Sequence, residues 1–97
     1  MADRITITPD ELRSSSSTFN TKADEISDIL NTLRQEVDSL EATWDGAAQD
    51  SFFQSYADME TTLTQFPEIL QGIAQQLSAV ADTLEQTDEE LASALGN

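Results

Sequence analysis

The chain contains no cysteine and no histidine. It therefore has no thiol for a disulfide or a thiolate metal site, and no imidazole to serve as a base or metal ligand near neutral pH. Its 97 residues amount to one small domain, and a domain of this size buries only about two-thirds of the surface that its unfolded chain exposes. Association with a further chain is the remaining way to stabilise so thin a core.

Positive charge is scarce. The chain has 4 basic and 19 acidic residues, for a net charge of −15. The first 34 residues hold all four bases and six acids, for a charge of −2, whereas the rest holds thirteen acids, for −13. This field repels phosphate backbones and anionic lipid headgroups, which argues against nucleic-acid binding and electrostatic membrane docking. A charged partner should be basic.

Long apolar runs are also missing. The opening stretch, MADRITITPDEL, is too polar for an N-terminal secretion signal, and nowhere are there eighteen consecutive apolar residues. We expect a soluble protein that is cytoplasmic when it is made. If it leaves the cell, it uses a route that reads no cleavable N-terminal signal.

The first helix has a clear start. Thr8 is placed as its N-cap, Pro9 as its first residue, and Glu11 as the third residue of a capping box. From there apolar residues recur in steps of four and three, and Ser16 fills the one gap. This heptad seam predicts a helix over about residues 8–43, with residues 1–7 as an extended arm; the seam residues are Leu12, Phe19, Ala23, Ile26, Leu30, Leu33, Val37, Leu40 and Trp44.

A second heptad seam follows the tripeptide Trp44-Asp45-Gly46 and predicts a helix over about residues 47–95. Thr87 is its polar gap. Pro67 lies inside this seam without resetting its phase, which favours a kink in the helix over a turn. The seam residues are Phe52, Tyr56, Met59, Leu63, Phe66, Leu70, Ile73, Leu77, Val80, Leu84, Leu91 and Ala94.

The two seams share one register. If the chain reverses near Gly46, opposing residues have numbers that sum to 92 or 93, as in Leu40 with Phe52 and Val37 with Tyr56. A constant sum requires matching phase as well as matching period. We therefore predict an all-α protein, one domain over residues 1–97, folded as an antiparallel helix-turn-helix hairpin. The remaining pairs are Leu33 with Met59, Leu30 with Leu63, Ile26 with Phe66, Ala23 with Leu70, Phe19 with Ile73, and Leu12 with Val80.

Two helices do not cover all of the apolar surface in this hairpin. Residues 81–97 should overhang the first helix, which leaves Leu84, Leu91 and Leu95 without partners. Packing two hairpins into a four-helix bundle would cover both this overhang and the residues beside the seam. The residues that we place beside the seam are Ile29, Phe53, Ile69, Ala74 and Ala81.

The sequence offers little for catalysis. Without His or Cys, a nucleophilic site would need a Ser-Lys pair built on Lys22, which lies in a polar stretch of one helix. The acids Asp38, Glu41 and Asp45 share a helix flank but lack calcium-loop spacing, and we interpret them as a solvated face. We expect no enzyme activity, cofactor, metal or small-molecule substrate.

Trp44 and Gly46 can each be interpreted in two ways. Trp44 continues the seam and is either the plug at the end of the hairpin or part of a recognition element. Gly46 is explained either by a left-handed residue at the helix end or by a close turn that excludes a Cβ atom.

The chain has about one hundred residues and two long predicted helices, with the W-x-G tripeptide Trp44-Asp45-Gly46 between them. In these features it resembles the WXG family of ESAT-like (early secreted antigenic target) proteins, which are exported by type VII secretion. A C-terminal pattern strengthens the resemblance, since Leu84, Asp88, Leu91 and Leu95 match the export motif of Firmicutes-type members. The mycobacterial form has Tyr where this chain has Leu84, so the Firmicutes type is favoured.

The resemblance implies a four-helix dimer, a homodimer or a pair with a second WXG-type protein, that a membrane FtsK/SpoIIIE-type ATPase recognises and exports. In an antiparallel dimer the C-terminal motif of one protomer would lie near the Trp-Asp-Gly turn of the other, as a two-part signal. The protein would then be secreted, with a possible carrier role for other substrates. A cytosolic helical adaptor or chaperone and a membrane-active virulence factor remain as alternatives.

Overall fold

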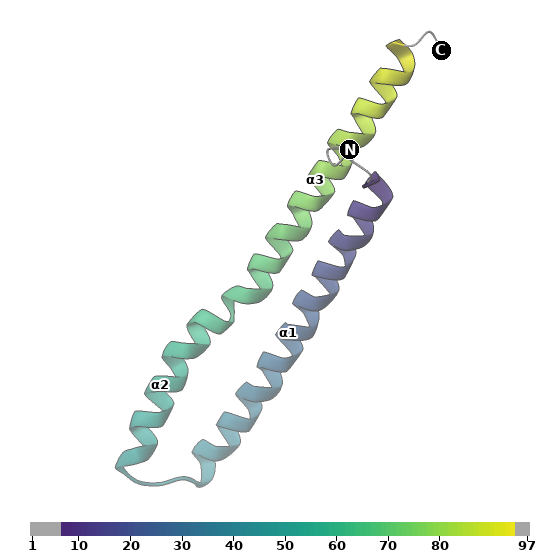
Figure 1. The fold of residues 1–97 in the computed structure, drawn as a ribbon. Coiled ribbons are helices and arrows are strands. Elements are labelled where there is room, and N and C mark those ends of the chain that lie inside the picture. The colour runs from purple at the N-terminus through teal and green to yellow at the C-terminus, as the bar shows by residue number, and fades with distance from the viewer. Residues whose placement is uncertain (1–6, 95–97) are drawn as a thin grey trace.

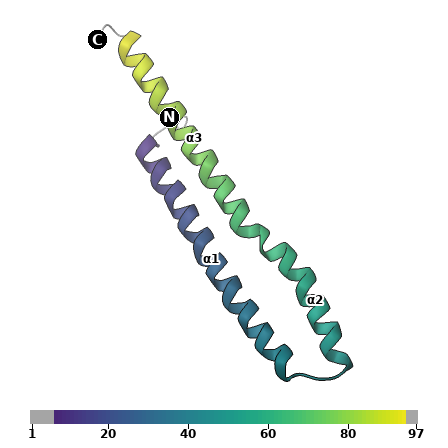
Figure 2. The same ribbon diagram turned by 180° about the vertical axis from the view of Figure 1, so that it is seen from behind.

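The structure, a computed structural model, describes residues 7–94, with side chains described as far as Glu89. It contains three helices, α1 (Pro9–Thr43), α2 (Ala47–Leu63) and α3 (Gln65–Ala94). Helix α1 runs antiparallel to α2 and α3, which follow each other along the second arm (Figures 1 and 2). The molecule is a rod of 77 by 22 by 19 Å. The predicted all-α hairpin is confirmed.

The predicted capping box opens α1. The Glu11 amide donates to Thr8 Oγ1 at 3.1 Å, and the Thr8 amide donates to Glu11 Oε1 at 2.9 Å. Pro9 is the first helical residue, where its missing N–H needs no partner. Asp10 and Glu11 add negative charge at the end where the helix dipole is positive.

The second arm contains two helices rather than one, because the backbone departs from the helical pattern at Thr64. Thr64 closes α2 by donating its amide to the Glu60 carbonyl at 2.9 Å, and its φ of −70° and ψ of −9° remain near helical values. Pro67 therefore falls in the first turn of α3, where its missing N–H is tolerated. This corrects the prediction of one kinked helix over residues 47–95 to two successive helices, although α2 and α3 run in nearly the same direction (Figure 1).

The hairpin interface is built from one row of each seam and from small residues. Ser16 donates its hydroxyl to the Ala74 carbonyl at 2.7 Å and lies 2.9 Å from Ser78 Oγ. The residue numbers of these two pairs sum to 90 and 94. These sums lie on either side of the predicted sums of 92 and 93, so they confirm the register. The buried apolar side chains are Leu12, Ala23, Leu30, Val37, Tyr56, Ala74 and Ala81, with Pro67 among them.

Ala74 and Ala81 correct one prediction. Both were placed beside the seam, yet they are 1% and 0% exposed. With Pro67 they form a row at heptad spacing that faces α1, because small side chains let two helices approach closely. The periodicity of α3 did not reveal this, since an apolar stripe several residues wide contains more than one heptad row.

The other half of each seam is exposed or half-buried. In α1 the row of Ile26, Leu33 and Leu40 is turned about 60° from the buried row, and in the second arm the row of Phe66 and Val80 is turned about 100°. Because the helices are antiparallel, both rotations point to the same side of the hairpin. We call this side the apolar face; its most exposed members are Ile29, Leu33, Leu40, Phe52, Met59, Phe66, Ile69 and Val80, at 36% to 55%.

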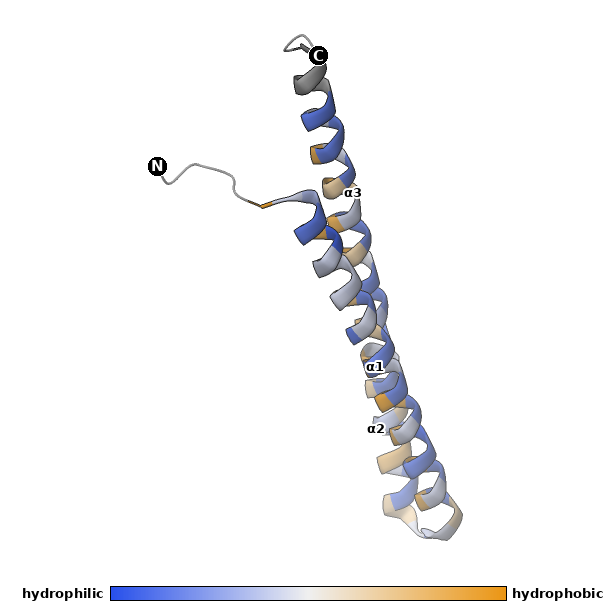
Figure 3. Ribbon diagram, turned by 90° about the vertical axis from the view of Figure 1, so that its right-hand side faces the viewer, coloured by the Kyte–Doolittle hydropathy of each residue, from blue (hydrophilic) through white to orange (hydrophobic). Residues whose placement is uncertain are grey.

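Polar residues surround these apolar rows. Hydrophilic and hydrophobic segments alternate along each of the three helices (Figure 3). No helix in the described part of the chain is long and apolar enough to cross a membrane.

Candidate functional site at the two ends of the hairpin

The Trp-Asp-Gly tripeptide is the connection between α1 and α2. Trp44 ends α1 in an extended conformation, and Gly46 is the N-cap of α2. Gln49 of α2 stabilises the connection through two hydrogen bonds. Its backbone amide donates to the Gly46 carbonyl at 3.1 Å, and its side-chain amide donates to the Glu41 carbonyl at 3.3 Å. The turn is therefore tied to both helices by one residue.

Gly46 is required by its backbone conformation. Its φ is +121° and its ψ is 172°, a region that is accessible almost only to glycine. A Cβ atom built at this position would meet nothing within 4 Å. Crowding therefore does not explain the glycine, and it caps the start of α2 rather than the end of α1.

Alanine substitutions at the two described glycines should have opposite effects. Gly46→Ala should lower the free energy of unfolding by about 1–3 kcal/mol through backbone strain. Gly72 lies inside α3, and its added Cβ would also meet nothing within 4 Å, so Gly72→Ala should raise it by roughly 0.5–1 kcal/mol. Urea unfolding of the wild type and both variants gives the two changes in the free energy of unfolding. Equal changes would contradict the assignment of strain to Gly46.

Trp44 is half-buried in an aromatic cluster at this end. Its ring centroid lies 5.4 Å from that of Phe52 and 5.7 Å from that of Phe53. Phe52 and Phe53 are 5.2 Å apart, and Phe52 stacks on Tyr56 with centroids 6.4 Å apart. The cluster connects the turn to the second and third turns of α2, so Trp44 does close the end of the hairpin.

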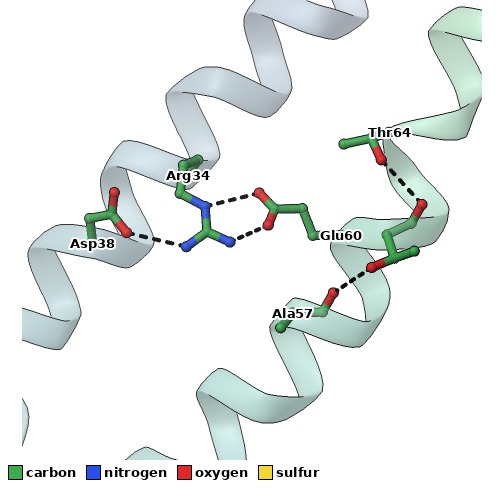
Figure 4. Close-up of polar contacts among 6 residues, drawn as sticks. Arg34, Asp38, Ala57, Glu60 and Thr64 are labelled. Carbon is green, nitrogen blue, oxygen red and sulfur yellow. Dashed lines mark hydrogen bonds and ion pairs between the residues drawn. The ribbon is translucent and has the colours of Figure 1, made fainter.

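Arg34 joins α1 to α2 (Figure 4). Its Nε donates to Glu60 Oε2 at 3.0 Å, while one of its terminal nitrogens donates to Glu60 Oε1 and the other to Asp38 Oδ1 at 3.2 Å. The guanidinium carbon lies 5.3 Å from the Tyr56 ring centroid. We did not predict this cluster, although Arg34 and Glu60 sum to 94 and so lie close to the register of the seams.

The pair of Arg34 and Glu60 should make stability depend on pH. Hydrogen bonds from Arg34, and then its charge, hold the pKa of Glu60 below its ordinary value. A lowered carboxyl pKa contributes stability above about pH 4.3, and this contribution disappears as the pH falls through the pKa of the folded protein.

Glu60→Gln should therefore lower the thermal midpoint at pH 7 and have less effect at acidic pH. Differential scanning calorimetry at both pH values checks this. Glu36→Gln is the matched control, because Glu36 is exposed in the same α1–α2 half of the molecule. A Glu60→Gln effect that stays the same at both pH values would contradict the prediction.

The opposite end of the hairpin carries the C-terminal motif. Arg13 donates one nitrogen to Asp82 and to Glu85, at 2.8 Å each, and α3 continues past the start of α1 (Figure 1). The packed part of α3 thus extends to Glu85, beyond the expected start of the overhang at residue 81. Leu84 is half-buried and Asp88 is exposed. The side chain of Leu91 and all of Leu95 lie outside the described residues.

The structure thus places the two motifs apart within one chain. The connection between α1 and α2, which contains Trp44, Asp45 and Gly46, lies at one end of the rod. The C-terminal part of α3, which contains Leu84 and Asp88, lies toward the other end (Figure 1). One hairpin by itself does not bring them together.

In the described part of the chain, the basic side chains are paired and the acidic side chains do not gather into a metal site. Each basic side chain within residues 7–89 is engaged, since Lys22 pairs with Glu25 at 3.1 Å beside the arginine pairs already described. Among the described residues, no group of three His, Cys, Asp or Glu side chains is arranged to hold a metal ion. The surfaces available for contact are the apolar face, the aromatic turn and acidic flanks.

Comparisons with known proteins agree over nearly the whole chain. The family model described as proteins of 100 residues with WXG matches residues 4–89. The ESAT-6-like protein SAG1039 of Streptococcus agalactiae is 39% identical over 90 residues, which cover 93% of this chain and 94% of the relative. The type VII secretion system extracellular protein A of Staphylococcus aureus is 28% identical over 92 residues, 95% of each chain. The crystal structure of Geobacillus thermodenitrificans EsxA superposes with a TM-score of 0.80 at 30% identity, covering 93% of this chain and 98% of that one.

Proposed function

Since this chain belongs to the family of WXG proteins of about 100 residues, we propose that it is a substrate of a type VII secretion system and leaves the cell as a folded dimer. One observation carries the proposal. A chain similar over 95% of its length to a type VII extracellular protein has the W-x-G tripeptide as the turn of its hairpin.

The apolar face supports the dimer. Eight large side chains on the hairpin surface are 36% to 55% exposed, Ile7 aside. Six of them form two rows at heptad spacing between the turn and Val80, one on α1 and one on the second arm: Leu33 and Leu40, and Phe52, Met59, Phe66 and Val80. A second copy that packs this face against its own would complete a four-helix bundle. A homodimer is consistent with the apolar face because every copy of the chain carries it. A second WXG-type protein with a similar apolar face would pack against this chain in the same way.

The separation of the two motifs supports an antiparallel arrangement. In such a dimer the turn of one protomer lies beside the C-terminal part of α3 of its partner. Trp44 and Gly46 of one chain would then form one export signal with Leu84, Asp88, Leu91 and Leu95 of the other. The signal would be complete only in the folded dimer, and a membrane FtsK/SpoIIIE-type ATPase would read it.

Cell fractionation tests this function. In a bacterium with an intact type VII system, the protein should accumulate in the culture medium, and disruption of the ATPase gene should retain it in the cytoplasm. A cytosolic adaptor would remain inside in both strains. Loss of other exported proteins from the medium when this chain is deleted would support the additional carrier role.

A further inference from the structure

A small pocket lies between α1 and the interrupted second arm. Its volume is about 240 Å³, and it is lined by Ser27, Leu30, Asn31, Thr64, Pro67, Glu68 and Gln71. Leu30 and Pro67 are buried, so the lining combines apolar surface with hydroxyl, amide and carboxylate groups. Thr64 is the residue at which the second arm is interrupted. The pocket therefore coincides with the junction of α2 and α3.

The pocket opens on the flank opposite to the apolar face. On α1, Ser27 and Asn31 are turned about 60° and 100° from the buried row in the direction opposite to Leu33. On α3, Gln71 and Glu68 are turned about 40° and 100° from the buried row, again away from the apolar residues. A second copy bound to the apolar face would leave this pocket open.

The lining favours a cationic ligand. Asn31, Gln71, Ser27 and Thr64 supply oxygen acceptors, and Glu68 supplies a carboxylate. Within the described residues the carboxylate of Glu68 takes part in no ion pair, and the lining contains no basic residue. The pocket thus offers negative charge and acceptors to a group that carries several donors.

The size of the pocket limits what such a group can be. Small-molecule sites usually measure about 300–1,000 Å³, and this pocket is smaller. A lysine ammonium has three donors and an arginine guanidinium has five, and either would place its aliphatic stem against Leu30 and Pro67. The net charge of −15 draws basic proteins toward this surface.

We propose that this pocket is the docking point for a single Lys or Arg side chain of a partner polypeptide, which binds on the outer flank of the hairpin. The partner is a basic protein other than the second copy, because a second copy covers the opposite side. This assignment does not depend on export, and it is tested with the purified full-length chain.

The test is an NMR titration of the ¹⁵N-labelled full-length protein. The probes are capped Gly-Lys-Gly and Gly-Arg-Gly peptides, added to about 10 mM so that dissociation constants near 1 mM are covered. We expect shifts concentrated at the amides of Ser27, Asn31, Thr64, Glu68 and Gln71, and none with capped Gly-Gln-Gly. Spermidine, a free polyamine, should not produce chemical-shift changes that are localised to these residues.

Two variants sharpen the test. Glu68→Gln should weaken binding of the basic peptides roughly tenfold, because it removes the charge that assists the hydrogen bonds. Glu36→Gln removes the same charge from an exposed position outside the pocket and should leave binding unchanged.

Three results would overturn the proposal. They are the absence of localised shifts, shifts spread evenly over the acidic surface, and equal binding by wild type and Glu68→Gln. A localised response to spermidine that matches the response to the peptides would assign the pocket to free polyamines and reject a polypeptide partner.

Discussion

Replacing Trp44 by alanine is expected to abolish export while the helical hairpin remains folded. Trp44 lies in the connection, and its ring contacts Phe52 and Phe53 of the aromatic cluster. The buried interface of α1 and α3, with Ser16 bonded to Ala74, does not include it. Circular dichroism of the purified variant should show unchanged helix content, and immunoblots of cells and medium should show the protein retained inside.

Asp45→Ala is the matched control for this substitution. Asp45 is exposed in the same connection and is the variable position of the W-x-G pattern, so its replacement should leave export unchanged. Secretion of a folded Trp44→Ala variant at the wild-type level would remove Trp44 from the export signal.

Co-expression of two defective chains tests whether two protomers share the signal. One chain carries Trp44→Ala, and the other lacks residues 86–97, so that Arg13 keeps its contacts with Asp82 and Glu85. In an antiparallel mixed dimer, the intact turn of the truncated chain lies beside the intact C-terminal motif of the other. Export of both chains together, but of neither alone, is the expected result; continued retention of both would mean that the motifs do not act across the dimer.

Replacing Leu33 by aspartate is expected to convert the proposed dimer into a monomer. Leu33 is 43% exposed in the single hairpin, so the fold of one chain loses little. Burial of a leucine contributes about 1.5–3 kcal/mol, and a symmetric dimer loses it twice. The dissociation constant should therefore rise by roughly a hundredfold or more, as measured by analytical ultracentrifugation over a range of concentrations.

Gln75→Asp provides the control for the introduced charge. Gln75 is exposed on α3 and lies about 100° from the buried row, away from the apolar face. This variant should keep the mass of a dimer. If Leu33→Asp also sediments as a dimer, the apolar face is not the interface between copies. Loss of export together with loss of the dimer would link the two properties.

The local elements of this fold were predictable because their signals are local. Thr8, Pro9 and Glu11 fix the start of α1 through hydrogen bonds within one turn of helix. Gly46 fixes the connection through a backbone conformation that other residues avoid. The antiparallel register was predictable because the short connection at Gly46 selects one of the pairings that two seams of the same period allow.

The interruption at Thr64 was less accessible to sequence reasoning. Pro67 indicates a disturbance, but a proline fits either a kink inside a helix or the first turn of a new one. The choice depends on whether the neighbouring backbone finds other partners, and here Thr64 donates its amide to Glu60. The pocket beside Thr64 follows from that choice and has no signature in the sequence.

The sequence by itself determined the helices, their connection, their register and the family, because capping, periodicity and the W-x-G tripeptide act over short distances along the chain. Only the tertiary structure decided which rows of the two apolar stripes meet. Ala74 and Ala81 face α1 while Leu33 and Met59 remain on the surface, because the rotation of each helix about its axis depends on how closely the backbones approach. That rotation created the apolar face, placed Arg34 against Glu60, and left the pocket at Glu68 on the opposite flank.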